Sequence, residues 1–418
     1  MSFETISVIG LGYIGLPTAA MFASRKKKVI GVDVNQHAVD TINQGKIHIV
    51  EPDLDMIVHS AVTDGYLKAV TTAEPADAFL IAVPTPFKPC KEAEIPEPDL
   101  SYIQSACNGI ASVLKKGDLV ILESTSPVGA TEQVAEWLAA ARPDLTFPQN
   151  AGNEADVNVA HCPERVLPGH VVRELVENDR VIGGMSSRCA ERSVELYKIF
   201  VQGECVITNA RTAEMAKLTE NSCRDVQIAF ANELSVICDK LSIDVWELIA
   251  LANRHPRVNI LQPGPGVGGH CIAVDPWFIV SKTPNEAQLI HTARKVNDAK
   301  PAWVIDKVKL AIADFLQANP TKTAKEVTVA CYGLAFKPDI DDLRESPALG
   351  IVNSIAEIHT GNVLAVEPNI ESFQSNKFKL VTVEDAALAN IHVMLVDHSS
   401  FKMVRITSGI IIDTKGIW

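Results

Sequence analysis

The sequence lacks three features that would place the protein in other classes. Its nine cysteines include no Cys-x-x-Cys pair and follow irregular spacing, which is not typical of a disulfide framework. No apolar run approaches the roughly 20 residues that a membrane-spanning helix needs. Basic residues are fewer than acidic residues, which gives the chain a formal net charge of −13 at pH 7. We therefore expect a reducing cytoplasmic location, no membrane insertion and no nucleic-acid partner.

Signals for a metal site and for secretion are also missing. His270 beside Cys271 is a poor chelating pair, and no partners lie at ligand spacing, so we expect no metal. Glu4 interrupts the apolar start of the chain, and the basic run 25–28 follows it, which is the wrong order for a signal peptide. The 418 residues are 47% hydrophobic and 21% charged, which indicates a soluble globular enzyme of two or three domains.

A glycine-rich turn is the first positive signal. Gly10, Gly12 and Gly15 form Gly-x-Gly-x-x-Gly between an apolar run at 5–9 and a helical pattern at 16–24. The glycines permit a tight turn, close approach of a pyrophosphate and close packing of helix on strand. Asp33 ends the next apolar run, where an acid meets a ribose 2′-hydroxyl and repels a 2′-phosphate. The pattern favours NAD over NADP, and an ordinary glycine turn with a solvated Asp33 is the alternative.

The rest of the chain predicts an α/β protein with two Rossmann-like, doubly wound domains joined by a central helical region with a long helix. Short β-rich runs alternate with helical segments in both halves, which is typical of parallel sheets. We expect strands at 5–9, 29–32, 77–83, 119–123, 327–332, 363–366 and 393–396. Helical periodicity predicts a long helix over 212–241 and another that begins at Pro301 and ends near 316. Ser346 and Pro347 have the residue types of a helix start.

The chemistry of the chain centres on Cys271. It ends a stretch of glycines at 264–269, and Asp275 follows shortly after. Glycines let a backbone approach a ligand, so this thiol is a candidate nucleophile that could attack an aldehyde carbon. A buried, structural cysteine is the alternative, and we assign that role to Cys107, Cys189, Cys238 and Cys331.

Three further sets of polar residues could serve such a reaction. Lys217 and Asn221 lie four apart and share a helix face, where they would steady an oxyanion unless the face is merely solvated. Glu164, just past a β-rich run, could act as general base for water. Lys337 and Arg344 precede a helix start and could bind an anion, or they could be surface charges beside the local aspartates.

Together these residues resemble the UDP-sugar 6-dehydrogenase family over nearly the whole chain. The resemblance implies an NAD-binding Rossmann-like domain at 1–205 and a central helical, dimerising region with the cysteine loop at 206–300. It also implies a C-terminal UDP-sugar-binding α/β domain at 301–418. NAD is the implied cofactor, a UDP-N-acetylhexosamine the implied substrate, and a homodimer or higher homo-oligomer the implied assembly.

The resemblance also assigns roles to single residues. It implies a nucleophilic Cys271, oxyanion contacts at Lys217 and Asn221, and acid–base or water-handling groups at Glu164, Asp275 and Thr125. The implied contacts to NAD are Gly10, Gly12, Tyr13, Ile14, Gly15, Asp33, Pro84, Thr85, Thr125 and Arg344. The implied contacts to the substrate are Glu164, Arg165, Val166, Lys217, Asn221, Arg254, His255, Arg257, Gly268 and Lys337, with Arg257 reaching a neighbouring subunit's substrate.

Two departures from the UDP-glucose enzymes indicate the branch that oxidises UDP-N-acetylhexosamines. They are His270 before the nucleophile and the sequence at 162–169 around Glu164. The stretches 218–234 and 253–257 look most like enzymes that oxidise UDP-N-acetyl-D-mannosamine at C6 in two steps, for enterobacterial common antigen. Oxidation of UDP-N-acetylglucosamine stays open, because only resemblance selects the epimer. A one-step β-hydroxyacid dehydrogenase and a non-catalytic NAD-binding protein are more distant alternatives.

Overall fold

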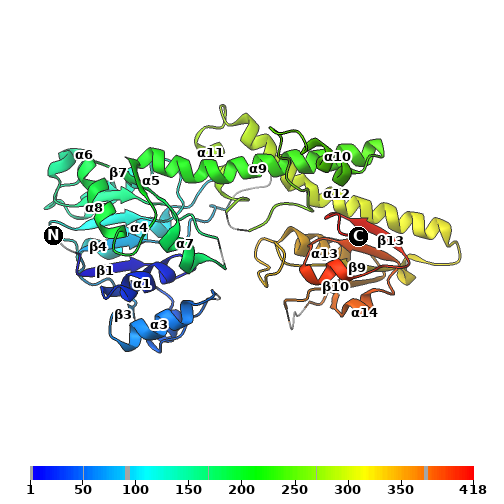
Figure 1. Cartoon of the computed structure of the whole chain (residues 1–418), viewed down its shortest axis with the longest axis horizontal. Helices are drawn as coiled ribbons and strands as arrows, with labels where there is room; N and C mark the ends of the chain where they lie inside the picture. Colours follow the sequence, from blue (N-terminus) through cyan, green and yellow to red (C-terminus); the bar gives the residue numbers. More distant parts are fainter. Residues whose placement is uncertain (1–2, 50, 90–94, 168, 270, 371–374) are drawn as a thin grey trace. The chain divides into compact units, whose positions relative to one another are not determined.

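The computed structural model describes residues 3–49, 51–89, 95–167, 169–269, 271–370 and 375–418 (Figure 1). The chain divides into two compact units, Met1–Thr219 and Glu220–Trp418. Each unit contains one β-sheet, and the long helix α9 (Ala210–Leu241) runs from the first unit into the second. The predicted α/β fold class, with two sheets and a long central helix, is confirmed. The three-region boundaries stay a prediction.

The sheet of the first unit has eight strands in the order β3-β2-β1-β4-β5-β6-β7-β8. All neighbouring pairs are parallel except β6 and β7. The strand order reverses between β1 and β4, and sheets of this kind bind nucleotides at the carboxyl ends of the strands at such a switch point. The strands are β1 (Thr5–Ile9), β2 (Lys28–Val32), β3 (Leu67–Val70), β4 (Ala78–Ile81), β5 (Leu119–Leu122), β6 (Asn158–His161), β7 (Arg180–Gly184) and β8 (Cys205–Asn209).

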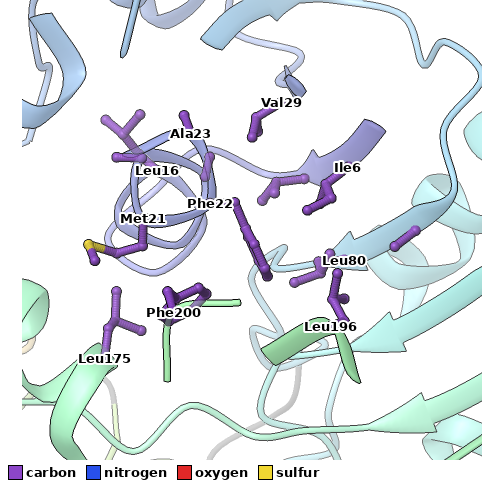
Figure 2. Packing of buried hydrophobic residues seen from close by; sticks show 14 of the residues in the cluster. Ile6, Leu16, Met21, Phe22, Ala23, Val29, Leu80, Leu175, Leu196 and Phe200 are labelled. Atoms are coloured by element: carbon purple, nitrogen blue, oxygen red, sulfur yellow. The ribbon is translucent and has the colours of Figure 1, made fainter. Parts of the chain in front are cut away.

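Apolar clusters cover both faces of this sheet, because alternate residues of its strands point to opposite faces. On β5, Leu119 and Ile121 face one cluster while Val120 and Leu122 face the other. In the first cluster, Phe22 lies among Leu80, Leu196 and Phe200 (Figure 2). The helices are α1 (Gly15–Ser24), α2 (Gln36–Asn43), α3 (Leu54–Thr63), α4 (Ser101–Ala111), α5 (Ala130–Ala141), α6 (Pro148–Ala151), α7 (Val171–Glu177), α8 (Ser187–Tyr197) and the short 3₁₀ turn η1 (Gly152–Glu154).

The sheet of the second unit is entirely parallel and has the order β11-β10-β9-β12-β13. Its order reverses between β9 and β12, which gives this sheet a switch point as well. Ser346 caps helix α13, as predicted, because its hydroxyl accepts a hydrogen bond from the Leu349 amide. The elements are β9 (Thr328–Tyr332), β10 (Asn362–Val366), β11 (Lys379–Leu380), β12 (Ile391–Met394), β13 (Ile410–Asp413), α13 (Pro347–Ile358), α14 (Val383–Ala386), η2 (Ala324–Glu326) and η3 (Ser399–Met403).

The remaining helices of the second unit are α10 (Val245–Ala252), α11 (Asp275–Lys282) and α12 (Gln288–Ala318). The prediction that a helix begins at Pro301 is wrong, because α12 begins at Gln288 and Pro301 lies inside it. Hydrogen bonds from Asn297 to Asp225 and from Lys307 to Asp239 join α12 to α9 on both sides of the proline position. These tertiary contacts offset the backbone bond that a proline removes. No helix in the described part of the chain meets the length and hydropathy of a membrane span.

Candidate active site

The glycine turn after β1 needs its first and third glycines for packing. Gly10 has φ +90°, and a Cβ there would lie 2.6 Å from the Ala82 carbonyl oxygen. A Cβ on Gly15 would lie 1.8 Å from the Gly10 carbonyl oxygen. A Cβ on Gly12, in contrast, would meet nothing within 4 Å. The turn therefore leaves open space above Gly12, where a pyrophosphate could approach the start of α1.

Asp33 braces this turn from the end of β2. One carboxylate oxygen accepts the Leu11 amide at 2.8 Å, and the other accepts the Asn35 amide at 2.9 Å. The carboxylate is half-buried, so lone pairs remain for a ribose hydroxyl. Tyr13 and Ile14 follow at the rim, with Tyr13 exposed and Ile14 at the N-cap of α1. These features fit NAD, as the sequence predicts.

The loops after β4 and β5 meet at the same edge of the sheet. Pro84 is exposed and Thr85 half-buried, and the Thr85 hydroxyl donates to the Thr125 carbonyl at 2.7 Å. The Ser124 hydroxyl donates to the Val83 carbonyl at 2.7 Å. Since β1, β4 and β5 are neighbours, these loops lie at the same edge of the sheet as the glycine turn. Thr125 is thereby fixed through its backbone, which leaves its side chain half-buried at the sheet edge.

Glu164 is buried, although a carboxylate in a loop is usually exposed. One of its oxygens accepts the Arg165 amide at 2.7 Å, and the other pairs with the buried Arg180 guanidinium at 2.5 Å. Arg165 and Val166 follow as half-buried residues, and Val166 packs against the first apolar cluster. The ion pair and the amide bond hold Glu164 in one orientation.

Asn221 and Asp275 come together in the second unit. The Asn221 amide donates to the Asp275 carboxylate at 2.5 Å. Lys217 lies one turn earlier on α9 and is half-buried. Asp275 is buried at the first position of α11, and its amide donates to the Cys271 carbonyl at 2.8 Å. Cys271 is exposed, whereas the four cysteines predicted to be structural are buried.

The glycine loop before Cys271 packs closely on the segment that precedes α13. A Cβ on Gly268 would lie 2.4 Å from the Glu345 carbonyl, and one on Gly266 would lie 2.9 Å from the Pro347 Cβ. Asn232 of α9 anchors the start of the loop, because its side chain accepts the Gly264 amide at 2.9 Å. Glycine is thus required for close approach, and His270 lies outside the described residues.

Lys337 and Arg344 lie in this same segment before α13. Arg344 is half-exposed and forms a bidentate pair with Asp342, with Nη2 to Oδ2 at 2.6 Å and Nε to Oδ1 at 2.9 Å. Lys337 is half-buried, with Nζ 6.0 Å from the Phe336 ring centroid.

Three further predicted substrate contacts lie on an exposed stretch after α10. They are Arg254, His255 and Arg257. The Arg257 amide donates to His255 Nδ1 at 3.3 Å.

The sequence interpretation missed a buried group next to Glu164. Arg180, Tyr197 and Glu123 are each at most 3% exposed, and the Tyr197 hydroxyl donates to Glu123 at 2.6 Å. Burial raises the pKa of Glu123 to about 7, with the nearby Arg180 opposing that rise. The sequence signal for two of these residues was a charge at the edge of an apolar run: position 123 ends one such run, and position 180 begins another.

Within the described part of the chain, no cluster of three or more His, Cys, Asp or Glu could hold a metal.

A doubly wound sheet with a dinucleotide turn at its switch point, together with a second parallel sheet, defines a nucleotide-binding dehydrogenase. Three models of one family match the chain: the NAD binding domain over 4–201, the central domain over 211–299 and the UDP binding domain over 330–418. The chain therefore belongs to the UDP-glucose/GDP-mannose dehydrogenase family. It is an NAD-dependent dehydrogenase, and a nucleotide sugar is its small-molecule partner.

Similar proteins support this assignment over the full length. A UDP-N-acetyl-D-mannosamine dehydrogenase from Yersinia pestis is 68% identical, with 100% of both chains covered. An NDP-N-acetyl-D-galactosaminuronic acid dehydrogenase from Ralstonia nicotianae is 62% identical, covering 100% of this chain and 97% of that one. The solved structure of a UDP-D-ManNAc dehydrogenase from Pyrococcus horikoshii matches with a TM-score of 0.86 and 38% identity, covering 99% of this chain and 96% of that one.

Proposed function

We propose that the protein oxidises the C6 alcohol of UDP-N-acetyl-D-mannosamine to the uronate in two steps. The observation that carries this proposal is the 68% identity, over all of both chains, to an enzyme named for that substrate. The exposed Cys271 supports the second oxidation, since a nucleophile is needed to hold the aldehyde. We further propose a cytoplasmic enzyme whose product serves a bacterial surface polysaccharide, the enterobacterial common antigen.

The proposed chemistry balances as a four-electron oxidation. NAD+, when bound, accepts one hydride from the alcohol and, as a second molecule, one from the thiohemiacetal. The Cys271 thiolate adds to C6 of the aldehyde, and loss of hydride from that adduct leaves a thioester. Water then attacks the thioester carbon, which releases the carboxylate and returns the thiol.

Five other residues supply charge stabilisation and proton transfer in this proposal. Lys217 and the Asn221 amide stabilise the oxyanion at C6, and Asp275 orients that amide through their hydrogen bond. Glu164 takes a proton from the attacking water, and its pair with Arg180 holds the carboxyl group in place. Thr125 helps to place the water and the nicotinamide.

We propose that the remaining predicted residues bind the two nucleotides. The glycine turn and Asp33 hold NAD, with Pro84 and Thr85 at the neighbouring loop. Lys337 and Gly268 contact the UDP-sugar from the segment and loop that pack together before α13. Arg344 contacts NAD, and Arg165 and Val166 contact the sugar nucleotide.

A second candidate substrate is the N-acetylgalactosamine epimer, which the 62% identity to the Ralstonia enzyme favours. The deciding assay measures NADH release in parallel with UDP-ManNAc, UDP-GlcNAc, UDP-GalNAc and UDP-glucose. We expect two NADH per sugar consumed and the highest kcat/KM with UDP-ManNAc. A higher kcat/KM with another sugar would reject the epimer, and one NADH per sugar would reject the two-step route.

We also propose that the protein is a homodimer that associates through α9. Phe230, Ile237 and Leu241 lie on one stripe of this helix and are 53%, 45% and 62% exposed within the single chain. Leu234 between them is only partly buried. Contiguous apolar side chains on a helix surface are typical of an interface, because each gains by leaving water.

Placing charges on this stripe is expected to separate the subunits. The double variant Phe230→Glu, Ile237→Glu buries two carboxylates in the interface, and sedimentation velocity should show a monomer where the unaltered protein is a dimer. Leu388→Glu is the matched control, since Leu388 is 86% exposed outside the stripe. A double variant that still sediments as a dimer, or an unaltered protein that is monomeric, rejects this interface.

A further inference from the structure

Four buried side chains of the first unit form one connected group beneath the ends of β5 and β6. Arg180 donates to Glu164 at 2.5 Å, and Tyr197 donates to Glu123 at 2.6 Å. The Arg180 guanidinium carbon lies 4.9 Å from the centroid of the Tyr197 ring, so the two hydrogen-bonded pairs touch. We refer to Glu123, Glu164, Arg180 and Tyr197 as the buried quartet. All four are at most 7% exposed.

The charges of the buried quartet do not balance if both carboxyl groups are ionised. Arg180 is one cation, whereas Glu123 and Glu164 would be two anions in a place with almost no water. Among the described residues, Arg180 is the cation whose charge acts on Glu123. Burial raises the pKa of the Cys162 thiol to about 12 and lowers the pKa of His161 to about 3, so both are neutral near pH 7. Burial also raises the pKa of Tyr197.

The two carboxyl groups are held differently, which indicates which of them keeps a proton. Both oxygens of Glu164 accept hydrogen bonds, one from a guanidinium and one from an amide. Only one oxygen of Glu123 has a partner, the Tyr197 hydroxyl. Its second oxygen is buried with no hydrogen-bond partner among the described residues. An unpartnered oxygen of this kind favours the protonated carboxyl group.

We propose that Arg180 is the positioning residue of Glu164. In this proposal Glu123 carries a proton, so that Arg180 pairs with Glu164 alone. While Glu123 is protonated, Arg180 pairs with a single carboxylate, and Glu164 stays fixed in its orientation. When Glu123 loses its proton, two carboxylates compete for one guanidinium, and Glu164 is held less firmly. The inference rests on the proposed role of Glu164 as general base and deepens it.

The place of Glu123 in the fold supports this coupling to the reaction. Glu123 directly follows β5 and immediately precedes the Ser124-Thr125 loop. β5 pairs in parallel with β6, with Leu122 opposite His161, so the chain positions that carry Glu123 and Glu164 leave the sheet side by side. The proton on Glu123 thus lies beneath the loops to which the water-handling roles are assigned.

The quartet is expected to give activity a particular pH dependence. Burial, with a smaller contribution from the charge of Glu164, raises the pKa of Glu123 to about 7, while Arg180 and Tyr197 oppose the rise. Above that pH the unaltered enzyme has two competing carboxylates, whereas a Glu123→Gln enzyme cannot ionise there. The kcat of Glu123→Gln relative to the unaltered enzyme should therefore be constant below about pH 7 and rise several-fold above it.

Stability gives a readout that does not depend on turnover. The folded-state pKa of Glu123 is raised from 4.5 to about 7, so the folded protein holds this proton where the unfolded chain has released it. Stability is then lost as the pH rises between those values and is level above them. The Tm of Glu123→Gln minus that of the unaltered protein should increase over the same interval.

Three further variants complete the experiment. Arg180→Lys keeps the charge but loses the planar guanidinium, so kcat should fall at least about tenfold with little change in KM. Tyr197→Phe removes a hydrogen bond that favours ionised Glu123, so the inflection in kcat should move up by about one pH unit. Arg211→Lys is the control, because Arg211 pairs with Glu132 at the surface and should leave the profile unchanged.

The outcomes separate this inference from the proposed function. If Glu164→Gln keeps the unaltered kcat, Glu164 is not the general base, and the role proposed for it in the reaction is rejected. If Glu164→Gln is slow, but the kcat of Glu123→Gln and of Tyr197→Phe keeps a constant ratio to that of the unaltered enzyme at every pH, only the coupling through Glu123 is rejected. If Glu123→Gln does not fold, an unmoved inflection in Tyr197→Phe rejects it instead.

Discussion

Cys271→Ser is expected to lower the rate of uronate formation by at least about 1,000-fold, because a serine hydroxyl is a far weaker nucleophile than a thiolate at neutral pH. The first hydride transfer does not need the thiol, so up to one NADH per active site should still form in a single turnover. Stopped-flow absorbance of NADH, with chromatographic measurement of the uronate, measures both effects. The unaltered enzyme should yield two NADH per uronate.

The matched control is Cys223→Ser. Cys223 and Cys271 are the cysteines classed as exposed in the described part of the chain, and Cys223 has no assigned role in the reaction. Its replacement should leave the rate of uronate formation within about twofold of the unaltered rate. Intact-mass spectrometry of acid-quenched enzyme should find a sugar adduct that is lost in Cys271→Ser only. A Cys271→Ser enzyme that works at full rate contradicts covalent catalysis.

Two glycines of the dinucleotide turn are expected to respond in opposite ways to the same added methyl group. In Gly15→Ala the new Cβ would lie 1.8 Å from the Gly10 carbonyl oxygen, which is part of the backbone and cannot move aside alone. The free energy of unfolding should fall by more than about 3 kcal/mol. Urea denaturation followed by circular dichroism measures this loss.

Gly12→Ala is the counterpart, because its Cβ would meet no protein atom within 4 Å. The free energy of unfolding should change by no more than about 0.5 kcal/mol. Affinity for NAD should nevertheless fall at least about tenfold, since the methyl group occupies the space that the turn leaves for the pyrophosphate. Isothermal titration with NAD tests this. Unchanged NAD affinity in a folded Gly12→Ala protein would place the cofactor elsewhere.

Much of the fold could be predicted from local sequence. The strands at 5–9 and 327–332, the helix at 212–241 and the cap at Ser346 depend on short patterns of apolar spacing, glycine and capping residues. Pro301 misled the prediction, because a proline ordinarily stops a helix. Here hydrogen bonds to α9 from Asn297 before the proline and from Lys307 after it hold α12 as one helix.

The candidate site also has parts that depend on local sequence and parts that depend on tertiary contacts. The sequence by itself determined the dinucleotide turn, Asp33 and the cysteine loop, because each depends on glycines or an acid at fixed short spacing. Only the tertiary structure decided that Glu164 is buried against Arg180, 16 residues further along the chain at the start of β7, and that Asn221 meets Asp275 across 54 residues. Burial and charge pairing arise when the sheet and helices pack, and no spacing along the chain encodes which distant group will then lie within hydrogen-bonding reach.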